Sequence, residues 1–170
     1  IVRNIELQPV NWSGGQIGSG YIPRGNSDSS AAMDGTNPLS GINQRTLTLS
    51  NGEVIWDIAG NVYDWTDATI LGKDEPKGVA NPSGFGWYEY SNLYSYGTFS
   101  PERLLPLNPS WNSTQGYGRI YTSGVATDLS TYSFLRGGRW GRESFAGVLA
   151  LALDNAPSVA ALGLGFRCAR

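Results

Sequence analysis

The chain has 170 residues, a length that suits one domain, and we expect residues 1–170 to form a single unit with a sizeable core. The formal net charge of -2 gives no general attraction to nucleic acid or anionic membranes, and no apolar run approaches the roughly 20 residues that cross a bilayer. The absence of histidine excludes a Ser-His-Asp triad and a His-ligated zinc site within the chain.

The first part of the chain predicts short elements separated by turns. Residues 1–45 carry many turn signals and little periodicity, which favours short strands and loops. Residues 45–49 alternate polar and apolar side chains, and Asn51-Gly52 supplies a hairpin turn before a strand over residues 54–56.

The middle of the chain is less regular. Residues 61–66 alternate in the manner of a strand. The following stretch, residues 67–130, is aromatic and punctuated by Gly and Pro, which is typical of a segment that packs on itself or carries function. Within it, a Ser-Pro pair at residues 100–101 predicts the start of a helix that Pro106 must end.

The C-terminal segment has the clearest pattern. Residues 134–136 predict a strand that a Gly-Gly pair closes, and residues 164–168 predict the last strand. Between them, Leu149, Leu151 and Leu153 alternate with small or polar residues, a period of two that places the leucines on one face. We therefore expect a sheet with one side packed and one side open.

Three stretches resemble the formylglycine-generating-enzyme branch of the C-type lectin fold. They are WDIAGNVYDW at residues 56–65, LRGGRW at 135–140 and GFRC at 165–168. The resemblance implies an α+β domain with a small twisted antiparallel sheet and long loops. In that family oxidase activity needs a pair of cysteines that hold copper, whereas Cys168 is the only cysteine of this chain. The sugar-binding triplets of the lectins are absent as well.

The tail is similar to the variable region of proteins diversified by retroelements. In these proteins an Asn-rich template resembling RGGNWNN, AGVFALNLNNAPSN and GFRCA is copied with errors at adenines, so its Asn positions vary while the framework stays fixed. The resemblance covers residues 136–168. It implies ten variable, ligand-binding residues: Arg139, Gly141, Arg142, Phe145, Ala152, Asp154, Asn155, Val159, Ala161 and Gly163. The status of Glu143 and Leu162, which lie among them, stays open.

From this resemblance we expect a ligand-binding protein that is not an enzyme. It would present its variable surface to a target on a cell or virus, and would itself lie on a virion or cell surface. A protein ligand is favoured over a glycan, with no nucleic-acid partner and no membrane insertion of this domain. Ala152 should tolerate exchange because it faces away from the leucines, and we expect no cofactor.

Several alternatives stay open. The chain could be a decayed oxidase of the formylglycine-generating type, or a fixed structural domain of a phage tail or surface protein. Asp57, Asn61 and Asp64 could bind Ca²⁺ through their side-chain oxygens. The favoured interpretation is that these side chains stabilise turns and form hydrogen bonds. We expect Cys168 to be a small buried apolar residue.

Overall fold

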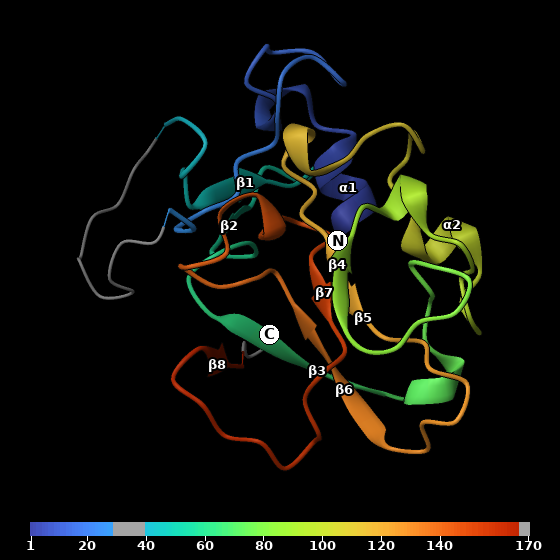
Figure 1. Ribbon diagram of the computed structural model, residues 1–170. Helices are drawn as coiled ribbons and strands as arrows, with labels where there is room; N and C mark the ends of the chain where they lie inside the picture. Colours follow the sequence, from blue (N-terminus) through green and yellow to red (C-terminus); the bar gives the residue numbers. More distant parts are fainter. Residues whose placement is uncertain (29–39, 167–170) are drawn as a thin grey trace.

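A computed structural model describes residues 1–28 and 40–166, which form two sheets joined by short helices and long loops (Figure 1). The strands are β1 (Thr46–Thr48), β2 (Val54–Trp56), β3 (Tyr63–Leu71), β4 (Gly86–Tyr88), β5 (Ile120–Thr122), β6 (Thr131–Arg136), β7 (Leu151–Ala152) and β8 (Leu164–Gly165). The α-helices are α1 (Val2–Glu6) and α2 (Pro101–Leu104). Single turns of 3₁₀-helix are η1 (Pro9–Asn11), η2 (Gly72–Asp74), η3 (Tyr90–Asn92), η4 (Ser113–Gln115) and η5 (Glu143–Phe145).

The main sheet has six strands in the order β4-β5-β7-β6-β3-β8, and β1 and β2 form a separate antiparallel hairpin. The expected antiparallel pairing is present in three strand pairs of this sheet, whereas β7 runs parallel to β5 and β8 runs parallel to β3. Both parallel pairs involve C-terminal strands that return to the sheet through loops instead of hairpins. In Figure 1 the red segment between β7 and β8 makes a wide loop below β8 and β3.

The strands of the main sheet divide their side chains between two faces. Leu151 in β7 and Ile120 in β5 belong to the large core, which also holds Ile5, Trp12 and Tyr90. The adjacent residues of the same strands turn the other way, into a small second cluster centred on three buried residues, Tyr63, Leu135 and Ala152. The pleat thus separates a fully packed face from a second face, on which η5 and the C-terminal loops lie.

The prediction of strands and loops over residues 1–45 is wrong at its start, where α1 and η1 form. These helices are too short to be stable alone, so packing holds them in place. Asn11 joins η1 to β1, since its Nδ2 donates to the Thr48 carbonyl at 2.8 Å and its Oδ1 accepts from the Thr48 amide at 2.8 Å. Trp12 Nε1 donates to the Glu6 carbonyl at 2.9 Å.

Most other predicted elements of the described residues are present. The hairpin around Asn51-Gly52 is confirmed by β1 and β2, and α2 begins at Pro101 as expected. Strand β7 is shorter than the alternating run suggested. The amides on either side of it still form hydrogen bonds, since Leu149 donates to the Tyr117 carbonyl and Leu153 to the Tyr121 carbonyl, each at 3.0 Å. Strands β4 and β5 were not predicted. No helix in the described parts of the chain is long and apolar enough to cross a membrane.

Candidate functional site

The second face of the sheet carries a pocket of about 200 Å³ at its C-terminal loops. Six of the ten residues predicted to bind ligand line it together: Arg139, Arg142, Asp154, Asn155, Ala161 and Gly163. The other lining residues are Tyr63, Tyr121 and Leu164, which come from β3, β5 and β8. Residues separated by more than twenty positions in the tail therefore converge on one cavity.

The remaining four predicted residues lie outside the pocket lining. Phe145 stacks on Trp87 with a centroid separation of 4.9 Å, and Gly141 is exposed with open space around its Cα. Val159 is half-buried in the loop before β8. Ala152 lies on the face opposite Leu151, as expected, but it is only 2% exposed because the second cluster covers it. The expectation that it sits on an open surface is therefore wrong.

Two arginines set the electrostatics of the pocket. The pKa of the Tyr63 hydroxyl is raised by burial, and the nearby Arg142 and Arg139 guanidinium groups oppose that rise. Burial also raises the pKa of Asp154, whose Oδ1 accepts a hydrogen bond from Asn155 Nδ2 at 2.7 Å. Two cations thus face one carboxylate whose charged form is disfavoured, so the pocket has a net positive character.

An aromatic column borders the pocket. The Trp87 ring lies between Tyr121, at 4.8 Å, and Phe145, at 4.9 Å between ring centroids. The Arg142 guanidinium carbon lies 5.4 Å from the centre of the Trp87 ring, and that of Arg119 lies 4.9 Å from the centre of Phe145. Aromatic and cation–π contacts of this kind hold side chains in fixed positions.

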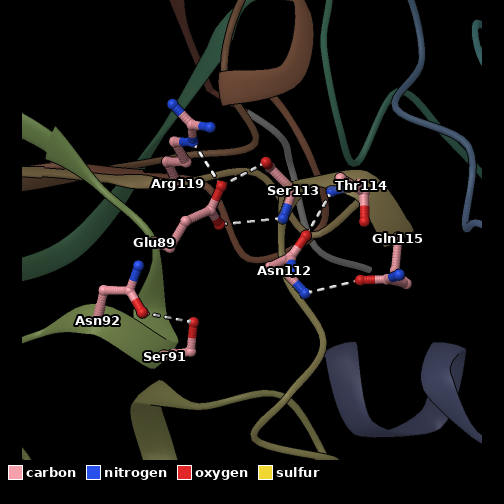
Figure 2. Close-up of polar contacts among 8 residues, drawn as sticks. All are labelled: Glu89, Ser91, Asn92, Asn112, Ser113, Thr114, Gln115 and Arg119. Carbon is pink, nitrogen blue, oxygen red and sulfur yellow. Dashed lines mark hydrogen bonds and ion pairs between the residues drawn. The ribbon is translucent and has the colours of Figure 1, made fainter.

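A polar network behind the column orients Arg119 (Figure 2). Glu89 accepts a hydrogen bond from Arg119 Nε at 2.6 Å and another from the Ser113 amide at 3.0 Å. Asn112 in turn caps η4, since its Oδ1 accepts from the Thr114 amide at 2.8 Å. The loop that carries η4 therefore anchors the cation on which Phe145 rests.

Sequence reasoning missed the part of the site that comes from the middle of the chain. Trp87 and Tyr121 lie in the unpredicted strands β4 and β5, where they pair across the two strands. An alternation of aromatic and other residues over three positions is too short to separate a strand from a loop. Tyr63 was assigned to a strand, but nothing in the sequence indicated that its hydroxyl meets the tail.

The glycines of the tail fall into two groups. A Cβ on Gly138 would lie 2.6 Å from Ala146 Cα, and Gly138 has a φ of +81°. A Cβ on Gly147 would lie 2.3 Å from a backbone oxygen. Gly141 has nothing within 4 Å of such an atom, and the closest neighbour at Gly163 is the flexible Arg139 side chain, at 2.8 Å. Gly138 and Gly147 of the predicted framework are thus sterically required, whereas the predicted variable Gly141 is not.

A larger pocket of about 640 Å³ lies between α1, α2 and the sheet. Its lining mixes aliphatic side chains such as Ile1, Val2 and Leu105 with charged ones such as Glu102 and Arg103. None of the ten predicted residues lines it. Because the residues predicted from the tail gather in the C-terminal pocket instead, we do not place the site in this larger pocket.

The side chains suggested for Ca²⁺ have other roles where the structure describes them. Arg45 Nε donates to Asp57 Oδ1 at 2.6 Å, and a second guanidinium nitrogen pairs with Oδ2. Asp57 and Asn61 both adopt positive φ, as residues in tight turns do. Within residues 1–28 and 40–166, no three acidic or cysteine side chains gather where they could hold a metal. Cys168 lies outside the described residues.

No protein-family model matches the chain, and no curated protein sequence matches it. The functional argument therefore depends on the geometry of the site and on the motifs of the tail.

Proposed function

We propose that the protein is a ligand-binding protein of the type diversified by retroelements, in which a fixed lectin-like scaffold presents an exchangeable C-terminal surface. One observation carries the proposal: six of the ten positions chosen from the motif pattern line a single pocket. The six come from three separate stretches of the tail, residues 139–142, 154–155 and 161–163, which the fold brings together. The function is recognition without a chemical step.

The division of the tail into framework and exchangeable positions supports the proposal. Framework residues Leu149 and Leu151 are buried in the large core, and Gly138 and Gly147 are sterically required. Most of the predicted variable positions are exposed or half-buried, with Ala152 and Gly163 as the exceptions. A surface that must accept many residues has to be separated from the core in this manner.

Contacts with the scaffold hold the loop that carries Arg139 in place. Arg139 rests over the Trp140 ring at 5.6 Å, and the Trp140 amide donates to the Asn61 carbonyl at 3.1 Å. The Gly137 amide donates to the Ala150 carbonyl at 3.1 Å, which ties the loop to the run that enters β7. Binding residues held on such a frame lose little freedom when a ligand binds.

Sequencing of the coding locus tests the proposal. We expect a nearby reverse-transcriptase gene and an adenine-rich near-copy of the segment that encodes residues 136–168. The copy should differ from the gene only opposite the ten positions. Whether Glu143 and Leu162 are also variable is decided by whether the copy and the gene differ opposite them. A locus with neither the template nor the reverse transcriptase would refute the proposal, and a fixed structural or binding domain would then be the better assignment.

A further inference from the structure

The C-terminal pocket contains two buried polar atoms without a hydrogen-bond partner among the described residues. They are the Tyr63 hydroxyl oxygen and Arg142 Nε, and the Arg142 guanidinium lies close enough to that hydroxyl to lower its pKa. Tyr63 is only 5% exposed, and the charges that act on its hydroxyl, Arg142, Arg139 and Asp154, all belong to residues that line the pocket. Buried polar groups are nearly always paired, so these two atoms mark where a ligand oxygen would gain most.

The donors in the pocket match an anion. Tyr63 offers a hydroxyl, and Arg139 and Arg142 each offer a guanidinium group. Among the described residues, Asp154 is the sole carboxylate that lines the pocket, and Asn155 already donates to it. A guanidinium fork binds a planar carboxylate through two parallel hydrogen bonds, and such charge-assisted bonds are stronger than neutral ones.

The size and the rim of the pocket point to a protein ligand. Its volume of about 200 Å³ is below the roughly 300–1,000 Å³ of small-molecule sites, so it suits a single side chain. Leu162 stands between two lining residues and is 95% exposed. Arginine is among the residue types enriched at protein interfaces, and two arginines, Arg139 and Arg142, line this pocket. The neighbouring Trp87 ring is already stacked against Tyr121 and Phe145, so it offers little free face to a sugar.

We propose that the pocket receives the carboxylate of an acidic side chain of a protein ligand, an inference that rests on the binding function proposed above. Arg142 holds the carboxylate, Arg139 approaches it from the side of Gly163, and the Tyr63 hydroxyl donates from the floor. The Tyr63 oxygen and Arg142 Nε are shielded by their neighbours. A shift of the Arg142 side chain must therefore accompany binding, with Leu162 adding apolar contact at the rim.

The test is an NMR titration of the full chain with N-acetylglutamate amide, followed through the arginine Nε–H signals at constant ionic strength. N-acetylglutamine amide is the matched neutral probe. The variants are Tyr63→Phe, which removes the hydroxyl and keeps the ring, and Arg142→Gln, read through the Arg139 signal. Arg103→Gln, an exposed arginine on α2, is the control.

We expect saturable shifts of the Arg142 and Arg139 signals with the carboxylate and none with the amide. The affinity should fall about tenfold in Tyr63→Phe, be lost in Arg142→Gln and stay unchanged in Arg103→Gln. Equal affinity in the wild type and both pocket variants would overturn the inference. Tighter binding of methyl phosphate or of N-acetylneuraminic acid would overturn it as well, because the pocket would then belong to another ligand class.

This experiment and the sequencing of the locus fail independently. A diversified locus with no carboxylate binding would leave the proposed function standing and remove the ligand assignment. Carboxylate binding by a chain whose locus has no template would support the ligand assignment and refute the proposed function.

Discussion

At the scale of single residues, the tail contains positions where the backbone conformation requires glycine and positions where it accepts other residues. Gly138 needs a left-handed φ of +81° and close contact with Ala146. Gly141, three residues later, meets nothing within 4 Å and has no positive φ. The two glycines are thus a matched pair that differ in constraint but not in chemistry.

We predict that Gly138→Ala lowers the free energy of unfolding by about 2 kcal/mol or more, because it adds a clash to an unfavourable φ. Gly141→Ala should change it by less than about 0.5 kcal/mol. Urea unfolding of both variants checks this. Equal losses at the two positions would contradict the separation of framework from exchangeable residues.

At the scale of elements, a buried carboxylate joins the turn after η2 to β5. Glu75 is fully buried, and its Oε2 accepts from the amides of Ser123 at 2.8 Å and Gly124 at 3.3 Å. Its Oε1 is buried without a partner among the described residues. Burial raises the pKa of Glu75 above its ordinary value of 4.5, while these hydrogen bonds lower it in part.

This raised pKa predicts how stability depends on pH. Between 4.5 and the raised value the folded chain holds a proton that the unfolded chain has lost, so stability falls as the pH rises through that window. The slope from this one group is at most about 1.4 kcal/mol per pH unit. The variant Glu75→Gln cannot titrate, and it should lack this part of the slope.

Urea unfolding from pH 4.5 upward, for the wild type and Glu75→Gln, measures the effect. We expect the wild type to lose stability relative to the variant as the pH rises and the difference to level off above the raised pKa. A difference that is constant with pH, or one that favours the wild type more at high pH, would show that the carboxyl does not titrate as described.

At the scale of the whole molecule, the sequence predicted elements best where the pattern was local. The hairpin at Asn51-Gly52, the helix at Pro101 and the alternation around Leu151 all follow from neighbouring residues, and the structure contains them. The helix α1 could not be foreseen, because its five residues owe their form to tertiary contacts of Ile5 and the segment that follows.

The same limit applies to the site. Motif spacing could name Arg139 and Asp154 as neighbours in function, since both lie in the tail. It could not name Trp87 or Tyr121, which reach the site through β4 and β5 from the irregular middle of the chain. It also could not show that Ala152 is covered, because period-two alternation assigns a face and not the loops that pack on it.

The most direct test of the central claim is a comparison of two libraries displayed on yeast and sorted for protease resistance. One randomises the nine predicted positions other than Ala152. The other randomises nine framework positions of the same tail: Arg136, Gly137, Gly138, Trp140, Ala146, Gly147, Val148, Leu149 and Leu151. If the C-terminal surface is exchangeable on a fixed frame, most members of the first library stay folded and few of the second do. Similar survival in both libraries would contradict that claim.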